Sequence, residues 1–328
     1  MGQVRFLSKT DVESLIDFEN TIDVVAEAFA AHQEGDTLLP PVLNMYMGKV
    51  RGELHIKSAY VESMNLISTK LITAFYHNPQ THNLPVGMGF IFLADGNTGL
   101  PLAVMDSSCI TFFRTGASGA LGIKHLARQN TCVGAMIGAG TNARYQLRGL
   151  AHFRKMKEVR VFDINRDAAK RFAREMAEEL MLNIVVFDGP RDAVEGADVV
   201  ITCTPATSPI IRKDWISPGT HINAMGADCK EKQELEESLF EGAKIVVDNK
   251  NQCLEFGECG KAVANGIIAA KDIYAEIGEL TAMKKPGRAD EDEVTIYDAT
   301  GVAIQDLAAA SLVYRRAEER SVGQLVDL

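Results

Sequence analysis

The sequence contains few of the features that mark proteins that bind nucleic acids, membranes or metals. Its 328 residues include no run of Lys or Arg longer than two, and 44 acidic residues against 34 basic ones give a formal net charge of −10. Nucleic acids and anionic membrane surfaces require concentrated positive charge, so we expect neither as a partner. The longest apolar stretch, residues 84–94, contains Pro85, Gly87 and Gly89 and is too short to cross a bilayer. Small molecules are therefore the expected ligands.

Cysteine usage excludes two further classes of protein. The six cysteines form no CxxC pair and have no histidine pair at a ligand spacing, so we expect neither a zinc site nor a disulfide framework, and no bound metal. The first residues carry charges where a secretory signal would have its apolar core. We expect a cytoplasmic protein with reduced thiols.

Two patterns of hydrophobicity divide the chain. Residues 10–34 have helical periodicity, and residues 54–105 contain short β-rich runs between turn clusters, which indicates a mixed sheet. After a helical stretch behind Arg114, strands and helices alternate from residue 133 onward, which predicts parallel strands with crossover helices. The acidic run at 287–293 is expected to be a solvated loop, and residues 301–320 a helix that returns to the first unit. The predicted strands of the second unit are 133–137, 158–162, 184–187, 199–202, 221–225 and 244–247, with helices at 141–155 and 168–180.

The most specific local motif is a glycine turn of the form G-x-G-x-x-A that follows a predicted strand and opens a predicted helix. The first glycine permits the tight turn, the second leaves room for a pyrophosphate, and the small last residue lets the helix pack on the strand. Backbone N–H groups at the helix N-terminus then face the phosphates. The motif predicts a Rossmann-type dinucleotide site that includes Gly138, Gly140, Thr141, Asn142 and Ala143.

An acidic residue follows the glycine turn at a suitable distance. Asp163 ends the next predicted strand, where a carboxylate accepts the ribose hydroxyl pair of NAD. An exposed aspartate at a strand end is the alternative interpretation, but the strand, turn, helix and strand around it favour cofactor binding. Asn165 and Arg166 follow, and Arg166 would instead suit the 2′-phosphate of NADP. We expect NAD(H), with NADP(H) as the alternative.

Several longer motifs occur in one order across nearly the whole chain. Together with the glycine turn, they resemble the ornithine cyclodeaminase/mu-crystallin family, which includes alanine dehydrogenases and ketimine reductases. The matching stretches are Ser68-Thr-Lys70-Leu with His77-Asn-Pro79 and Asn83-Leu-Pro85, Phe113-Arg114-Thr115-Gly-Ala117, Thr220 to Asp228 with Lys232-Gln-Glu-Leu235, and Tyr297 to Asp306.

The resemblance implies an α/β protein in which a doubly wound Rossmann-type domain, residues 116–305, is inserted in a smaller α+β domain. Residues 1–115 with 306–328 would form this substrate-binding and dimerisation domain of a homodimer. The active site would lie between the domains, with the nicotinamide facing the carbon of a small amino or imino acid.

The resemblance also assigns roles to side chains. Arg114 would bind the substrate carboxylate, because a planar guanidinium binds carboxylates bidentately. Lys70 would contact the substrate and take part in catalysis, although the sequence alone favours a lysine that reaches out to solvent. Asp228 would be the general acid or base at the reacting nitrogen. The expected cofactor contacts are completed by Thr115, Thr202, Thr204, Met225, Gly226 and Val302.

Departures from the family pattern bear on which reaction is expected. His55 aligns where cyclodeaminases that convert ornithine to proline carry a glutamate, and Asn44 replaces the usual carboxylate-binding arginine. Lys57 stands where methionine is common, so it either supplies a second cation for the carboxylate or is a solvent-facing strand residue.

Three functions remain open at this point. The first is an NAD(P)-dependent oxidoreductase that interconverts a small α-amino acid with its imine or keto acid, as a ketimine reductase or alanine dehydrogenase does. The second is an ornithine cyclodeaminase that uses NAD catalytically. The third is a non-catalytic protein that binds nucleotide and a small ligand, as mu-crystallin does.

Overall fold

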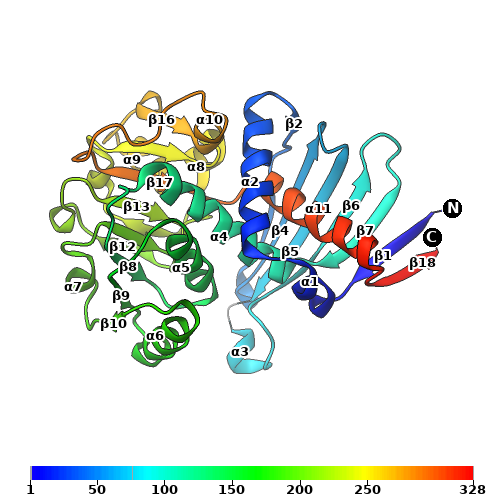
Figure 1. The fold of residues 1–328 in the computed structure, drawn as a ribbon, viewed down its shortest axis with the longest axis horizontal. Coiled ribbons are helices and arrows are strands. Elements are labelled where there is room, and N and C mark those ends of the chain that lie inside the picture. The colour runs from blue at the N-terminus through cyan, green and yellow to red at the C-terminus, as the bar shows by residue number, and fades with distance from the viewer. Residues whose placement is uncertain (1, 76, 328) are drawn as a thin grey trace. The chain divides into compact units, whose positions relative to one another are not determined.

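The computed structural model describes residues 2–75 and 77–327, except for the side chain of residue 79. These residues form two compact units (Figure 1). Unit 1 contains the described residues up to 114 and those from 302 onward, and unit 2 contains residues 115–301. Helix α4 (Ser107–Leu126) continues from unit 1 into unit 2.

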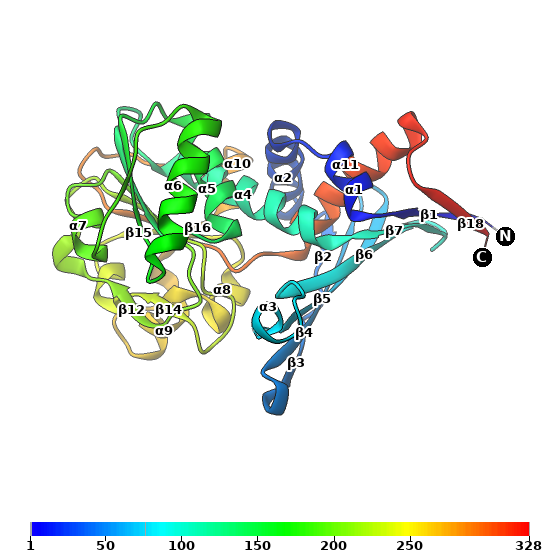
Figure 2. The same cartoon turned by 90° about the horizontal axis from the view of Figure 1, so that it is seen from below.

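Unit 1 is a mixed sheet with helices on one face. The strand order is β18-β1-β7-β6-β5-β4-β2, with β3 also paired to β4, and β1 with β7 is the parallel pair. Helices α1, α2 and α11 cover one face of this sheet (Figure 2). Its strands are β1 (Gln3–Leu7), β2 (Thr37–Leu38), β3 (Leu43–Met47), β4 (Gly52–Val61), β5 (Leu66–Phe75), β6 (Gly87–Asp95), β7 (Pro101–Asp106) and β18 (Gln324–Asp327), and its helices α1 (Lys9–Leu15), α2 (Phe18–Gln33), the short α3 (Asn78–Thr81) and α11 (Ala303–Arg320).

The alternation of side chains along the strands explains why the helices cover one face of this sheet. Ile91, Leu93 and Met105 point toward the helices and are fully buried against residues such as Leu15 and Val313. Residues between them point to the opposite face and stay partly exposed, as on β6, where Phe90 is 43% exposed. The second face therefore presents partly exposed apolar side chains.

Unit 2 is an all-parallel, doubly wound sheet with strand order β10-β9-β8-β11-β13-β17-β15-β16. Helices α7, α8 and α9 pack on one face, where Val200, Ile222 and Ile245 form the core. The predicted fold class is thus confirmed. The elements are β8 (Val133–Ile137), α5 (Thr141–Phe153), β9 (Glu158–Phe162), α6 (Arg166–Leu180), β10 (Ile184–Val186), α7 (Pro190–Val194), β11 (Val199–Thr202), β13 (His221–Ala224), β15 (Lys244–Val247), α8 (Lys250–Phe256), α9 (Glu258–Ala264), β16 (Ile273–Glu276), α10 (Ile277–Thr281), β17 (Thr295–Asp298) and a separate ribbon of β12 (Thr207–Ile211) and β14 (Gln233–Leu235).

The strand order reverses between β8 and β11. Strands β9 and β10 extend the sheet on one side of β8, whereas β11 and β13 extend it on the other. In open α/β sheets, ligands bind at the carboxyl ends of the strands where the order reverses. The glycine turn follows β8, and Thr202 ends β11, so both lie at this point.

The helix around Arg114 begins earlier than the sequence indicates. The prediction placed helical structure after Arg114, but α4 starts at Ser107. β-branched and aromatic residues in 110–113 have low helix propensity, and burial of Cys109 and Ile110 in the core of unit 1 outweighs this preference. The short strands β1, β16, β17 and β18 were not predicted. Strands β1, β17 and β18 pair with segments far away in the sequence, and β16 is a four-residue strand at the edge of its sheet.

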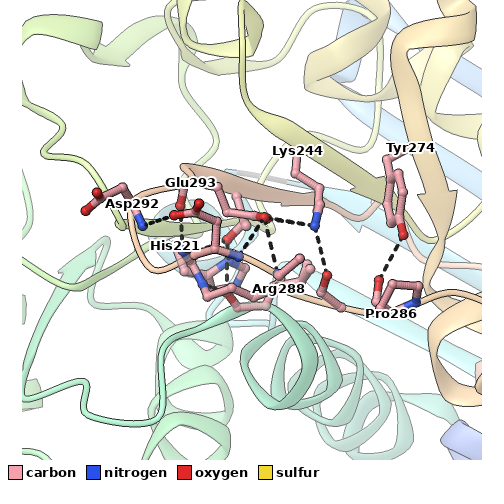
Figure 3. Close-up of polar contacts among 12 residues, drawn as sticks. His221, Lys244, Tyr274, Pro286, Arg288, Asp292 and Glu293 are labelled. Atoms are coloured by element: carbon pink, nitrogen blue, oxygen red, sulfur yellow. Dashed lines mark hydrogen bonds and ion pairs between the residues drawn. The ribbon is translucent and has the colours of Figure 1, made fainter.

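The acidic segment at 287–293 is more firmly held than a solvated loop. The Arg288 guanidinium donates to the carbonyl of Leu126 at 2.6 Å and to the Thr295 hydroxyl at 3.0 Å. Lys244 donates to the carbonyl of Gly287 at 2.9 Å and pairs with Glu293 at 2.8 Å (Figure 3). The tip, residues 289–292, is exposed as expected, while both ends of the segment are hydrogen-bonded to unit 2.

Candidate active site

Unit 1 contains a buried cluster of charged side chains where β5, α4 and α11 meet. Lys70, on β5, is only 2% exposed, so it does not reach solvent. Its Nζ donates to Oδ1 of Asp306 at 2.8 Å, and the Nε of Arg114 donates to the same oxygen at 3.0 Å. The Nη1 of Arg114 also donates to Oε1 of Gln305 at 2.9 Å. Asp306 therefore holds two predicted substrate-binding cations side by side.

The position of Asp306 explains how a buried carboxylate is tolerated. It lies in the first turn of α11, where the helix dipole favours a negative charge. Burial alone would raise the pKa of Asp306, but Arg114 and Lys70 outweigh this effect, so its pKa lies below the ordinary value. Asp306 is therefore ionised at neutral pH.

The pKa of Lys70 lies far below its ordinary value. Burial lowers its pKa to about 7, Asp306 opposes the shift, and the neighbouring cations Arg114 and Lys57 add to it. Lys70 thus changes its protonation near neutral pH, as a group that exchanges protons with a substrate must. An anionic ligand placed beside it would raise this pKa again.

Lys57 stands directly across the sheet from Lys70. The two residues are cross-strand partners between β4 and β5, so their side chains lie on the same face. Like charges at such positions repel, and the pair is therefore expected only where anions offset it. Lys57 is half-buried, and its charge acts on both Lys70 and Asp306, which disfavours the interpretation of a solvent-facing strand residue.

A second polar group extends along the same strands. His55, two residues before Lys57 on β4, has its Nδ1 2.5 Å from Oδ1 of Asn44 and its Nε2 2.8 Å from Oε2 of Glu53. Asn44 comes from β3, where it pairs directly with His55. Two of the three positions that depart from the family pattern, His55 and Asn44, are thus in contact with each other.

In unit 2, the glycine turn has the geometry that its sequence predicts. Gly138 has φ +105°, a conformation that strongly favours glycine, and a Cβ there would lie 3.1 Å from the carbonyl oxygen of Cys203. Gly140 is the N-cap of α5 and provides no side-chain cap for the first turn, which contains Thr141, Asn142 and the buried Ala143. A Cβ on Gly140 would meet no atom within 4 Å. The helix N-terminus is therefore open to an anion.

Asp163 is fixed to this turn. Its Oδ2 accepts the backbone N–H of Ala139 at 2.8 Å, and its Oδ1 accepts the N–H of Asn165 at 2.7 Å. The side-chain oxygen of Asn165 accepts the backbone N–H of Ala168 and thereby caps α6. Arg166 forms an exposed ion pair with Asp188. The carboxylate is thus oriented by the backbone of the turn.

A carboxylate that was not among the predicted residues joins the loops at the carboxyl ends of β11 and β13. Glu234, on β14, is fully buried and accepts the N–H of Thr204 at 2.6 Å and that of Gly226 at 3.0 Å. Burial raises the pKa of Glu234 to about 7. A Cβ on Gly226 would lie 2.3 Å from Oε2 of Glu234, so glycine is required there. Two other predicted cofactor contacts are buried beside these loops: Thr202 lies two residues before Thr204, and Met225 directly before Gly226.

The remaining predicted residues are divided between the units. Asp228 follows β13 in unit 2, is 53% exposed and pairs with Lys232 at 2.5 Å. Thr115, on the unit 2 part of α4, accepts a hydrogen bond from Gln146 through its carbonyl at 2.9 Å. Val302 belongs to unit 1 as the N-cap of α11. Unit 1 therefore contains the three predicted substrate-binding residues, and unit 2 contains Asp228.

Asp306 and Glu234 are the two residues that sequence reasoning missed. Each lies inside a motif that carried the family resemblance, Glu234 in Lys232-Gln-Glu-Leu235 and Asp306 at the end of the stretch from Tyr297. Their place in these motifs is the signal that could have pointed to both.

Comparisons with known proteins identify the family. The model of the ornithine cyclodeaminase/mu-crystallin family matches residues 3–321. The chain belongs to this family. It is 38% identical to alanine dehydrogenase from Archaeoglobus fulgidus over 99% of this chain and 98% of that protein.

Solved structures of family members agree with this assignment. An archaeal alanine dehydrogenase dimer with bound NAD superposes with a TM-score of 0.94 at 37% identity and covers both chains completely. The Δ1-pyrroline-2-carboxylate reductase of Thermococcus litoralis, in complex with NADH and L-proline, has a TM-score of 0.95 at 33% identity, covering 98% of this chain and all of that one. The fold of the family is thus shared over the whole length of the chain.

Neither a membrane-spanning helix nor a metal-binding cluster occurs among the residues that the structure describes. Within the part of the chain that the structure describes, no helix has the length and hydropathy needed to span a membrane. Residues 2–75 and 77–327 also contain no group of three or more His, Cys, Asp or Glu side chains arranged to hold a metal ion.

Proposed function

We propose that this protein is an NAD(H)-dependent oxidoreductase that interconverts a small α-amino acid and its imine or keto acid. The observation that carries the proposal is the buried cluster in which Lys70 and Arg114 share one oxygen of Asp306, with Lys57 across the strand pair from Lys70. An anionic ligand such as a carboxylate would complete this cluster of cations. The family assignment supports hydride chemistry for that ligand.

The residues of unit 2 fit the dinucleotide. The space over Gly140 and the N-terminus of α5 would hold the pyrophosphate, and Asp163 would accept the ribose hydroxyls. Thr204 and Gly226, held by Glu234, would line the nicotinamide side. When bound, the nicotinamide supplies the hydride donor or acceptor. We favour NAD(H) over NADP(H), because Asp163 is anchored to the turn and Arg166 is paired with Asp188.

The proposed roles of the side chains follow from their charges and contacts. Arg114 would bind the substrate carboxylate, Lys57 would supply a further cation for the substrate beside it, and Asp306 would hold Arg114 and Lys70 in place. Lys70, with a pKa of about 7, would stabilise charge that forms beside the reacting carbon. Asp228 would give a proton to the reacting nitrogen or take one from it.

The ornithine cyclodeaminase reaction is the less supported alternative. It requires a group that accepts the distal ammonium of ornithine, and Glu53 is a carboxylate on the face of Lys57. Glu53 is already paired with His55 at 2.8 Å, and the second neighbour of His55 is an amide. This arrangement favours the oxidoreductase.

The test of the function combines a substrate panel with a matched pair of glycine variants. Consumption of NADH with keto acids plus ammonia, or with cyclic imino acids, is expected for the wild type. Ornithine converted to proline and ammonia without a net change in NADH absorbance would instead indicate cyclodeamination. No turnover together with intact nucleotide binding would indicate a binding protein of the mu-crystallin type.

Gly140→Ala tests the dinucleotide site, because its Cβ meets nothing in the protein but would occupy the pyrophosphate position. We expect normal thermal stability and at least a tenfold loss of NADH affinity. Gly189→Ala is the control, since Gly189 is also the N-cap of a helix and its Cβ would make only an ordinary contact. Equal NADH affinity in both variants would contradict the assignment.

We further propose a homodimer formed through the apolar face of the sheet in unit 1. Phe92 pairs with Val104 on this face, and Phe90, two residues before Phe92 on β6, is 43% exposed. The archaeal alanine dehydrogenase is described as a dimer, and its fold covers this whole chain. Burial of such a face in a second copy removes apolar surface from water.

A further inference from the structure

We propose that Asn44, His55 and Lys57 form a second anion-binding position beside Lys70 and Arg114, so that the preferred substrate carries two carboxylates. This inference rests on the proposed oxidoreductase function and narrows its substrate class to imino or keto dicarboxylic acids and the matching amino acids. It depends on the register of β3, β4 and β5, on the hydrogen bonds of His55, and on the charges of the shared face.

The register places these side chains in one row. Lys57 pairs with Lys70 across β4 and β5, and His55 pairs with Asn44 across β4 and β3. Because side chains alternate between faces, residues 53, 55 and 57 of β4 all lie on the face of Lys70. Two residues along a strand span about 7 Å. The row thus extends from the substrate cations by a distance that suits a short four-carbon chain.

The contacts of His55 hold its ring between two neighbours. Its Nε2 lies 2.8 Å from Oε2 of Glu53, and its Nδ1 lies 2.5 Å from Oδ1 of Asn44. An ionised carboxylate only accepts hydrogen bonds, so Nε2 is the donor to Glu53. The Glu53 carboxylate is therefore already engaged by His55.

The same contact orients Asn44. With Oδ1 accepting from His55, the Nδ2 amino group points away from the ring and presents N–H donors to the same region. Donors bind carboxylate oxygens and reject an ammonium group. The part of the row beyond Lys57 therefore selects an oxygen acceptor.

The charged side chains of the face favour a second carboxylate near Lys57. Asp306 is engaged by Lys70 and Arg114, and Glu53 is engaged by His55. Lys57 lies on the same face, across from Lys70 and two residues along β4 from His55. A distal carboxylate of the substrate would lie between the Lys57 ammonium and the Asn44 amide, where a methyl group would make no such contact.

The reaction for this substrate class is balanced with NADH alone as the reductant. The hydride adds to the imine carbon, and the electron pair of the C=N bond moves to nitrogen, which takes a proton. NADH is oxidised to NAD⁺, and the imino dicarboxylate is reduced to the amino dicarboxylate. Both carboxylates remain intact, so they serve only for binding and orientation.

The test uses unreactive acids that differ only at the distal end. Succinate, propionate and 4-aminobutyrate are titrated into the wild-type enzyme with bound NADH, with nicotinamide fluorescence as the readout. We expect succinate to bind at least tenfold more tightly than propionate, and 4-aminobutyrate to bind most weakly. In turnover, kcat/KM with oxaloacetate plus ammonia should exceed that with pyruvate plus ammonia by a similar factor.

A pair of variants distinguishes a specific effect at Asn44 from a general effect of added negative charge. Asn44→Asp replaces the donor by an acceptor, and we expect the preference for succinate over propionate to fall tenfold and 4-aminobutyrate to bind more tightly. Asn97→Asp makes the same substitution in the exposed turn between β6 and β7 and should leave the preference unchanged. His55→Gln, compared with His32→Gln on α2, should weaken succinate more than propionate.

Each outcome of the test has a definite meaning. If the wild type binds succinate no more tightly than propionate, or if Asn44→Asp does not change the preference, the inference is wrong. The proposed function still stands in that case, provided that NADH is oxidised with a substrate bearing one carboxylate. If the wild type does not bind NADH at all, the proposed function itself is wrong.

Discussion

The substitution Asp306→Asn tests the central assumption that one buried carboxylate holds the two substrate-binding cations. Asp306 is 1% exposed and contacts Lys70 and Arg114 at 2.8 and 3.0 Å. Asparagine has nearly the same size but no charge, so the variant leaves the Arg114 guanidinium buried without this carboxylate and removes the charge that keeps Lys70 protonated. Removal of one partner of a buried ion pair costs about 3–5 kcal/mol of unfolding free energy. For a domain of this size, that loss lowers the melting temperature by roughly 6–20 °C.

The pH dependence gives a second readout. Lys70 titrates near pH 7 in the folded protein, against an ordinary value of 10.5. Between these values the unfolded chain binds more protons at this site, so the contribution of Lys70 to stability rises with pH through this window. In Asp306→Asn the supporting charge is lost and the pKa of Lys70 falls further. The rise should then begin below pH 7.

The assay is thermal unfolding from pH 5 to 10, together with the KM for the substrate at pH 7. We expect a lower melting temperature at every pH and a KM at least tenfold higher, because Lys70 is then neutral. Asp23→Asn, at an exposed position on α2, is the control and should change neither quantity. A melting temperature within a degree of the wild type would refute the proposed role of Asp306.

Three further predictions address the cofactor, the loops and the dimer. Asp163→Ala should raise the KM for NADH at least tenfold and affect NADPH less, and equal effects on both would contradict its role at the ribose. Glu234 has a pKa of about 7 in place of 4.5, so the folded protein binds more protons between these values and its stability falls as pH rises through them. Glu234→Gln should remove this dependence from melting curves and raise the KM for NADH more than it lowers kcat, because the amide cannot accept from both Thr204 and Gly226. Phe90→Asp should convert the dimer to a monomer in light scattering, and an unchanged mass would place the interface elsewhere.

Much of unit 2 could be predicted because its pattern is local. Strand β8 and the start of α5 lie where hydrophobic periodicity and the glycine turn place them. The conformation of Gly138 depends on the absence of a side chain, and the open N-terminus of α5 follows from Gly140 as its N-cap. Short edge strands such as β16 and β18 carry no comparable signal, because each has only four residues and no long apolar run marks it.

The protonation of the substrate-binding groups could not be predicted in the same way. The sequence alone favours a solvent-reaching Lys70, and only the family resemblance reverses this interpretation. Burial and the charges of Asp306, Arg114 and Lys57 set its pKa, and all of these act through space.

The sequence by itself determined the family, the doubly wound sheet and the dinucleotide turn, because these depend on residues close together in the chain. Only the tertiary structure decided that Asp306, 236 residues after Lys70, holds that lysine and Arg114 together. It also decided that Lys57 faces Lys70 and that His55 bridges Asn44 and Glu53, because strand register sets these contacts. A local pattern specifies backbone conformation, whereas the charge of a site depends on which distant side chains the fold brings into contact.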